Sequence, residues 1–452
     1  MKKTILLYSC IVLVLAGVAV LLRIAGIDTT RGMVTYLLPV AVVLLGMAAV
    51  YNPESIFYLV LASLPFAEGL LKFEIGSVTF NIYTIGMVAL GGFCGWRIIT
   101  GTSRLRFIPQ DIAILLLCVL YLGTTLNSTD VIGSGFLAFH AIFIPVVSFY
   151  VLRIYVTTEE RFWLCFRFFC LGIILFSVAG ISQFFVNKQR LEVLSVPPVG
   201  AATFFLIPVL FAKHLATAKK IKLTIFLLSS VAFILTFTRV YLFLLFLSPI
   251  IYFLIRRGFA RLLIFLMLLF SLFATLTLSY SVYTPEEFDT LNLVEERQEY
   301  AAKERMIDRM TDPKLWKRAL VGRALSYREG LNNFIKHPIV GTGLYKGVIV
   351  KGGQKYGMIT RHNFHVEWLE YGGIAGYMAS FFFVMLYFSR LANAAKHHKI
   401  LALNLVAVFV ILCNSLTNGF MHGVMPLVTF IMMGFGVSYY WLIRREVLSG
   451  EL

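Results

Sequence analysis

The chain has 452 residues, of which 59% are hydrophobic and 14% are charged, and its formal net charge is +17. Ordinary soluble domains contain about 45–50% apolar and about 25% charged residues, so this composition excludes a typical soluble protein. The positive charges are divided among short segments between apolar stretches, which argues against a nucleic-acid-binding surface and for contact with membrane lipids.

Uncharged stretches of about twenty residues, the length of a helix that crosses a bilayer, recur along the chain. These stretches must be helical, because lipid offers no hydrogen-bond partner to an open backbone. The sequence therefore predicts an all-α polytopic membrane protein with about 14 (12–14) transmembrane helices. The predicted spans are 4–25, 33–51, 55–71, 76–97, 108–128, 132–152, 164–186, 193–212, 221–238, 240–256, 262–283, 363–389, 400–418 and 423–443.

Four of these spans need comment. The first has too long an apolar run for a secretory signal, so we expect it to be retained. The third is short and contains Glu68, which leaves a re-entrant segment as an alternative to a full crossing. The apolar run 223–255 would be about 50 Å long as one helix, so it is expected to form two spans that turn at Arg239.

The basic residues also predict the orientation, because Lys and Arg concentrate in cytoplasmic loops. Counting loops from a cytoplasmic N-terminus puts most basic clusters on one side, among them 219–222, 256–261 and 444–445. We therefore expect a multi-pass membrane protein with both termini in the cytoplasm. The 280–361 loop and Arg239 are then expected on the outer side of the membrane.

The predicted domains are helices 1–11 (1–283), a large, partly helical periplasmic loop (284–362) and helices 12–14 (363–452). In the loop, 295–309 has opposite charges three and four residues apart, as in a solvated helix. A second amphipathic helix containing Arg323 is expected to end at His337-Pro338, before Gly341 and Gly343, because proline and glycine stop helices.

Polar groups gather where this loop meets the twelfth span. Arg361, His362 and Asn363 are followed by Glu367 and Glu370 inside the apolar run. One interpretation is that His362 and Asn363 merely cap the helix. The two carboxylates favour the other, a functional cavity, because ionisable groups in membrane helices are costly and usually functional. Two glycines, Gly373 and Gly376, follow at the spacing of close helix packing.

Three sequence elements carry a family resemblance: Thr238-Arg239, then Gly322-Arg323 with 337–343, then His362-Asn363 with 373–376. In this order they resemble the O-antigen ligase and O-antigen polymerase superfamily of bacterial membrane proteins. The resemblance implies transfer of a glycan from undecaprenyl diphosphate to a sugar hydroxyl at the periplasmic face of the bacterial inner membrane. The acceptor would be lipid A core for a ligase, which we favour, or another lipid-linked repeat unit for a polymerase.

The resemblance also implies a reaction without metal or other cofactor. Arginine can then hold the leaving diphosphate, because it is permanently charged and bidentate toward phosphate oxygens. Arg239 and Arg323 are the candidates, with Arg361 as a third. His362 is the candidate general base for the acceptor hydroxyl. Asn363, His365 and Glu370 are weaker candidates for contacts with the diphosphate or the acceptor.

Two other classes of protein remain as alternatives. A secondary transporter or lipid-linked oligosaccharide flippase would show matching halves with interrupted helices near the bilayer midplane. No internal repeat is evident here, and the polar residues gather at one face. A scaffold without chemistry would leave the histidine and the arginines unexplained.

Overall fold

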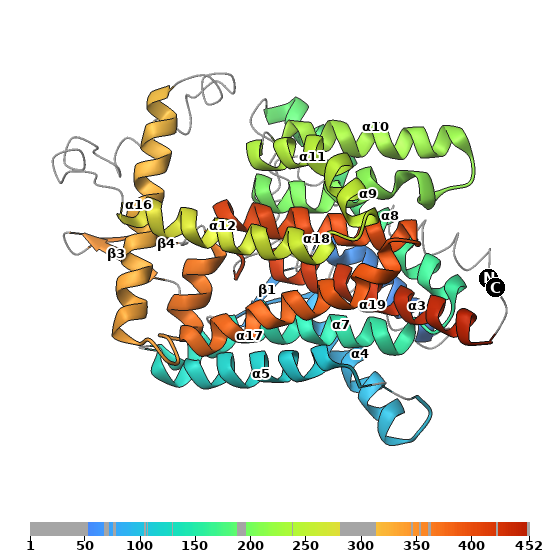
Figure 1. Cartoon of the computed structure of the whole chain (residues 1–452), viewed down its shortest axis with the longest axis horizontal. Helices are drawn as coiled ribbons and strands as arrows, with labels where there is room; N and C mark the ends of the chain where they lie inside the picture. The colour runs from blue at the N-terminus through green and yellow to red at the C-terminus, as the bar shows by residue number, and fades with distance from the viewer. Residues whose placement is uncertain are drawn as a thin grey trace.

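The structure is a computed structural model that describes residues 53–66, 72–75, 78–103, 105, 107–128, 130–187, 196–236, 238–280, 313–344, 347–351, 354–359, 363–421 and 424–449. Helices dominate this part of the chain (Figure 1). They are α3 (Pro53–Ser63), α4 (Ile82–Ile99), α5 (Pro109–Thr124), α6 (Val131–Ala138), α7 (Ile144–Tyr155), α8 (Glu159–Asn187), α9 (Pro198–Leu215), α10 (Lys219–Leu235), α11 (Arg239–Arg256), α12 (Ala260–Tyr280), α16 (Pro313–Lys336), α17 (Phe364–Ala395), α18 (Lys399–Asn418) and α19 (Met425–Ser449).

Shorter elements complete the described part. The 3-10 turns η1 (Leu64–Phe66) and η2 (Thr125–Asn127) extend α3 and α5, and a π-helical segment, η3 (Phe139–Phe143), joins α6 to α7. Two antiparallel hairpins, which the sequence analysis did not predict, pair β1 (Lys72–Ile75) with β2 (Val78–Asn81) and β3 (Gly347–Lys351) with β4 (Gln354–Ile359).

The predicted all-α polytopic fold is confirmed. Within the described residues, nine helices are long and apolar enough to cross a membrane. In the most apolar stretch of each helix, the share of buried residues is highest in α18 (83%) and α19 (78%) and lowest in α12 (22%). α18 and α19 therefore form the centre of the bundle. The outer face of α12 exposes Phe270 and Phe273, a surface suited to lipid.

The predicted turn at Arg239 is confirmed, because α10 ends at Leu235 and α11 begins at Arg239. The short third span is only 11 residues of α-helix plus η1, and Glu68 lies outside the described residues. The fourth span begins at Ile82, later than predicted, because a strand precedes it. Spans 4–25 and 33–51 and the helix predicted at 295–309 also lie outside the described residues, and the number of crossings stays a prediction.

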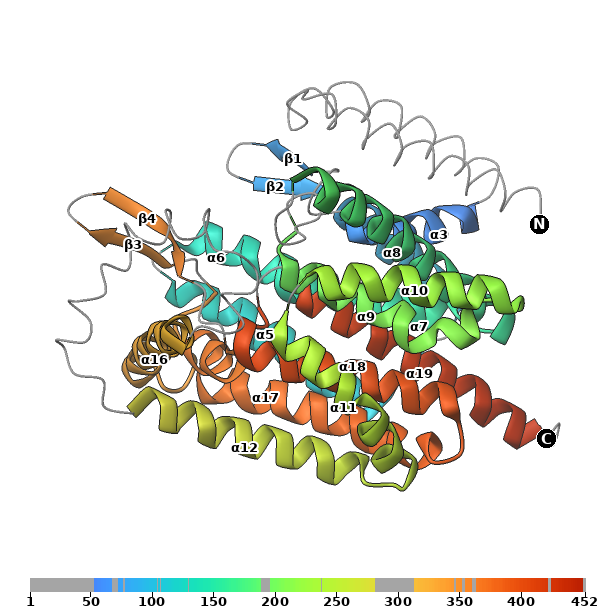
Figure 2. The ribbon, with the colours of Figure 1, turned by 90° about the horizontal axis from the view of Figure 1, so that it is seen from above.

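α16 lies across one end of the bundle, as Figures 1 and 2 show, and packs against α12 and α17. Its buried residues Ala324, Tyr327 and Leu331 recur at helical spacing and form the face toward the bundle, while Glu329 and Lys336 are exposed. The helix ends at Lys336, directly before His337-Pro338 as predicted. The β3–β4 hairpin lies at the same end of the molecule (Figure 2).

Candidate active site

α17 is broken inside the bundle. Gly373 has φ 61° and ψ −166°, so two helical segments meet at this residue. In an unbroken helix, Ile374 and Ala375 would donate their N–H groups to the carbonyls of Glu370 and Tyr371. The break frees these four groups in an apolar region, where an unpaired backbone group is costly.

The 337–343 loop after α16 binds all four groups. The two freed carbonyls and the two freed N–H groups each find a partner in this loop. The bonds are Thr342 N to Glu370 O (2.8 Å), Gly343 N to Tyr371 O (3.1 Å), Ile374 N to Pro338 O (2.8 Å) and Ala375 N to Ile339 O (3.2 Å). The loop thus replaces the missing hydrogen bonds of α17, and it attaches the end of α16 to the break.

The two glycines of the Gly-x-x-Gly pattern have different roles. Gly376 lies close to the ring of Tyr121 on α5, which agrees with the predicted close packing. Gly373 instead supplies a backbone conformation that residues with a Cβ rarely adopt. Close helix packing was predicted for both glycines. Gly376 fits this role, whereas Gly373 packs closely against the 337–343 loop and forms the break in the helix.

Asn363 caps α17, and both polar atoms of its side chain are hydrogen-bonded. Its Oδ1 accepts from the N–H groups of His365 (2.9 Å) and Val366 (3.3 Å). Its Nδ2 donates to Thr275 Oγ1 on α12 and to the carbonyl of Leu416 on α18, both at 2.9 Å. The capping part of the prediction is thus confirmed for Asn363, which fixes the backbone directly after His362.

His365 is fully buried, and both of its ring nitrogens are hydrogen-bonded. Nε2 lies 2.7 Å from Ser271 Oγ on α12, and Nδ1 lies 3.0 Å from Tyr377 Oη, beyond the break in its own helix. A contact between His365 and substrate would require one of these bonds to open, and that contact stays a prediction.

The two carboxylates are also buried and engaged with protein. Glu367 Oε2 accepts from the N–H groups of Phe420 (2.5 Å) and Met421 (2.8 Å), in the turn between α18 and α19. Glu370 Oε1 accepts from Asn333 Nδ2 of α16 at 2.7 Å. The first turns of α17 therefore bind the surrounding elements through these carboxylates, and a contact between Glu370 and substrate stays a prediction.

Arg323 on α16 is half-buried and lies one helical turn from Tyr327. Burial raises the pKa of the Tyr327 phenol, against the opposing influence of the Arg323 charge and of Asn363. The protonated phenol donates to the carbonyl of Leu416 at 3.5 Å, the same carbonyl that accepts from Asn363. The region around Arg323 therefore lies next to the start of α17.

Arg239 is half-buried at the first position of α11, after the buried residue Thr238. Two residues further on, Tyr241 is fully buried and hydrogen-bonded to Thr203 of α9 at 2.6 Å. α11 packs along α18 and also contacts α17, so Arg239 begins a helix that is firmly anchored in the same bundle.

Residues 224–384 match a family described as O-antigen ligase. This segment belongs to the O-antigen ligase family. It runs from α10 through most of α17 and contains Arg239, Arg323, His362 and the break at Gly373. The predicted resemblance to the O-antigen ligase and polymerase superfamily is confirmed for this segment. No curated protein matches the chain.

The ligase-family segment thus contains the predicted catalytic residues, of which the structure describes Arg239 and Arg323. Arg361 and His362 lie outside the described residues. No group of three potential metal ligands occurs in the described part of the chain, and metal independence stays a prediction.

Several residues that the sequence patterns did not indicate hold this end of the ligase-family segment together. They are Ser271 and Thr275 on α12, Tyr327 and Asn333 on α16, and Tyr377 on α17. Polar residues spaced by four in an apolar span, as Ser271, Thr275 and Ser279 are, form a stripe that could have indicated the buried face of α12.

Proposed function

We propose that the chain transfers a glycan from undecaprenyl diphosphate to a sugar hydroxyl at the periplasmic face of the inner membrane, as an O-antigen ligase that acts on lipid A core. The observation that carries the proposal is the family match over residues 224–384, which spans every residue assigned to the reaction. The hydrogen bonds of Tyr327 and Asn363 to Leu416 add support, because they join the region of Arg323 to the residue after His362.

In the proposed reaction, His362 removes the proton of the acceptor hydroxyl as that oxygen attacks the anomeric carbon of the donor sugar. The new glycosidic bond forms, and the bond between the anomeric carbon and the diphosphate oxygen breaks. Undecaprenyl diphosphate leaves with the bonding electrons, and the proton remains on His362 until it passes to water.

The arginines stabilise the charge that develops on the departing diphosphate. A guanidinium presents its N–H donors in a planar fork that fits two phosphate oxygens at once, which a lysine cannot reproduce. Arg239 and Arg323 take this role, and Arg361 is a third candidate. Both described arginines are half-buried, and a partly desolvated charge interacts more strongly with an anion than an exposed one does.

Asn363 acts on the reaction through the backbone. All of its polar side-chain atoms are occupied, so it does not orient the imidazole of His362 by a free hydrogen bond of its own. It fixes the start of α17 between α12 and α18. His365, Glu367 and Glu370 secure the same turns of α17 to their neighbours.

The break in α17 argues against a transporter. Interrupted helices in transporters use their open backbone ends to bind substrate and ions. In this chain the loop that follows α16 occupies the ends freed at Gly373. The break therefore serves to attach α16 to the bundle.

The experiment that tests the proposal incubates the purified chain with undecaprenyl-diphosphate-linked glycan and one of two acceptors. Transfer to lipid A core supports the ligase assignment, and transfer to a second lipid-linked unit supports the polymerase. A strain that lacks the gene gives the matching cellular result. Loss of all capped lipid A indicates a ligase, and capping with single repeats indicates a polymerase. Transfer to neither acceptor would contradict the proposal.

A further inference from the structure

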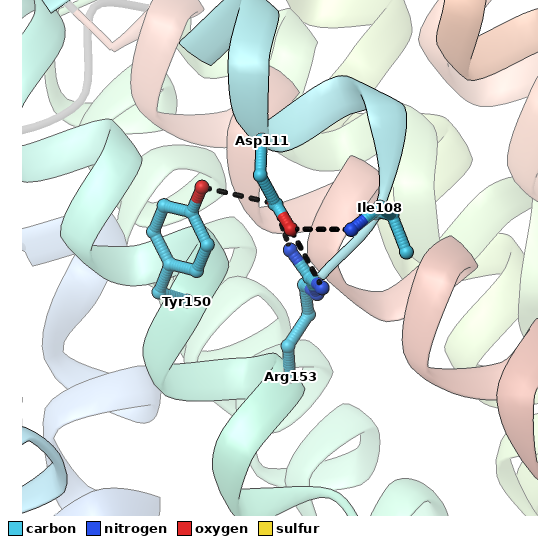
Figure 3. Close-up of polar contacts among 4 residues, drawn as sticks. All are labelled: Ile108, Asp111, Tyr150 and Arg153. Atoms are coloured by element: carbon cyan, nitrogen blue, oxygen red, sulfur yellow. Dashed lines mark hydrogen bonds and ion pairs between the residues drawn. The ribbon is translucent and has the colours of Figure 1, made fainter. Parts of the chain in front are cut away.

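The end of the bundle opposite α16 contains a buried ion pair. Asp111, in the first turn of α5, binds Arg153, in the last turn of α7 (Figure 3). The carboxylate also accepts from Tyr150 Oη at 2.9 Å and from the N–H of Ile108 at 2.8 Å. Arg153 therefore shows how this fold satisfies a buried guanidinium, with a carboxylate and several hydrogen bonds.

Arg390, near the end of α17, has a different environment. Its guanidinium carbon lies 5.4 Å from the ring centre of Tyr440 and 5.2 Å from that of Trp441, both on α19. Its Nε is buried and has no hydrogen-bond partner among the described residues. Within the described residues, Arg390 forms no ion pair with a carboxylate.

A second arginine, Arg444, also lies against the ring of Trp441. The guanidinium carbon of Arg444 lies 5.3 Å from the ring centre of Trp441 and is exposed at the surface. Ring faces attract cations but do not accept the N–H groups at the guanidinium edge. Two like charges that share one aromatic ring also repel each other. An anion that bridges both arginines would satisfy the donors and remove the repulsion.

The carboxylate whose charge reaches Arg390 is that of Asp111, and it is already bound to Arg153. The position of the two arginines favours a membrane source, because tryptophan and tyrosine concentrate where headgroups meet hydrocarbon. Two turns before Arg390, α17 also exposes Phe382, which gives an acyl chain an apolar surface.

We propose that Arg390 and Arg444 bind the phosphate of an anionic phospholipid headgroup, with Tyr440 and Trp441 as the aromatic wall of the site. The site lies at the end of the bundle remote from α16, and it does not depend on the proposed transferase activity. The lipid secures the end of α17 to α19 in the way that Asp111 secures α5 to α7.

The test measures lipid binding to the purified full-length chain by native mass spectrometry. Delipidated protein is titrated with phosphatidylglycerol or phosphatidylcholine, and inorganic phosphate is added as a competitor. Arg390→Gln and Arg444→Gln should each raise the apparent Kd for phosphatidylglycerol by about tenfold or more, since each removes a charge-assisted contact. Arg257→Gln, which removes an exposed positive charge elsewhere, should change the apparent Kd by less than about twofold.

Three results would overturn the proposal. Equal losses in the Arg390, Arg444 and Arg257 variants would mean that only the overall positive charge attracts the lipid. Equal binding of phosphatidylcholine would exclude an anion-specific site. Displacement of the lipid by millimolar phosphate would identify a site for the free ion instead. Arg444→Gln keeps the test decisive if Arg390→Gln fails to fold, because Arg444 is exposed.

Discussion

The backbone of Gly341, in the loop after α16, lies directly against the backbone of Gly373, at the break in α17. A Cβ atom at residue 341 would lie 2.5 Å from the nitrogen of Gly373, and a Cβ at residue 373 would lie 2.6 Å from the nitrogen of Gly341. Both residues also have positive φ angles, 68° and 61°. This close approach lets the loop replace the hydrogen bonds that α17 loses at its break.

Gly373→Ala should therefore destabilise the chain strongly. The backbone conformation of residue 373 costs about 1–3 kcal/mol for residues other than glycine, and the clash with the loop adds to that cost. The measurement is the thermal unfolding midpoint of the purified protein in detergent. Gly92→Ala in α4 is the control, because its Cβ would meet no neighbouring atom and it should be neutral or slightly stabilising. Equal midpoints for the two variants would contradict the described contact.

Two substitutions of Glu370 distinguish a structural role of its carboxylate from a role in substrate binding. Glu370→Gln keeps an oxygen that can accept from Asn333, so stability and transfer should remain close to those of the wild type. Glu370→Ala leaves the Asn333 amide without this acceptor and should lower stability by about 1–3 kcal/mol. Unfolding midpoints and transfer rates of both variants are the measurement. A stable but inactive Glu370→Gln protein would instead indicate that the charge contacts substrate.

The two arginines should be sensitive even to lysine. Arg239→Ala and Arg323→Ala should each reduce transfer by about 100-fold or more, the usual cost of losing one preorganised charge stabiliser. Lysine at either position should restore little, because it lacks the planar fork. Rates are measured on membrane-inserted, folded protein, with Lys336→Ala as the control on the exposed face of α16. Near-full activity of both lysine variants would contradict bidentate binding of the diphosphate, because a positive charge alone would then be enough.

The sequence predicted the spans well because span length and lipid solvation act locally. The turn at Arg239 and the end of α16 before Pro338 follow from nearest neighbours in the chain, and both are confirmed. The break at Gly373 was not predicted, because it depends on a loop thirty residues earlier that supplies the missing hydrogen bonds.

For the candidate site too, contacts between segments far apart in the sequence could not be predicted. The pattern of charged and polar residues correctly located the family segment, since the chemistry depends on residue types in a fixed order. It suggested that Glu367 and Glu370 face a cavity, which stays a prediction, but it did not indicate that both accept hydrogen bonds from protein groups. The hydrogen-bond donors come from the α18–α19 turn and from α16, so the local sequence of α17 does not predict them.

The orientation of the chain also has a direct test. Cysteines introduced at Lys336 and Ala218, both exposed, lie on opposite sides of the membrane in the orientation expected from the basic residues. An impermeant thiol reagent added outside the inner membrane should label residue 336 and spare residue 218, with the wild-type chain as the background control. Labelling of residue 218 would reverse the orientation and move the proposed active site to the cytoplasm.

The central claim is that His362 is the general base, and its most direct test is the substitution His362→Asn. Asn363 already supplies the cap of α17, so the variant should fold and unfold as the wild type does. The measurement is the rate of transfer from purified undecaprenyl-diphosphate-linked glycan, alongside the unfolding midpoint, with Asn81→Ala as a control that removes the comparable cap of α4. We predict a stable His362→Asn protein whose transfer rate is lower by about 10²–10⁴, the usual cost of losing a general base. A stable His362→Asn protein that transfers glycan at the wild-type rate would contradict the account.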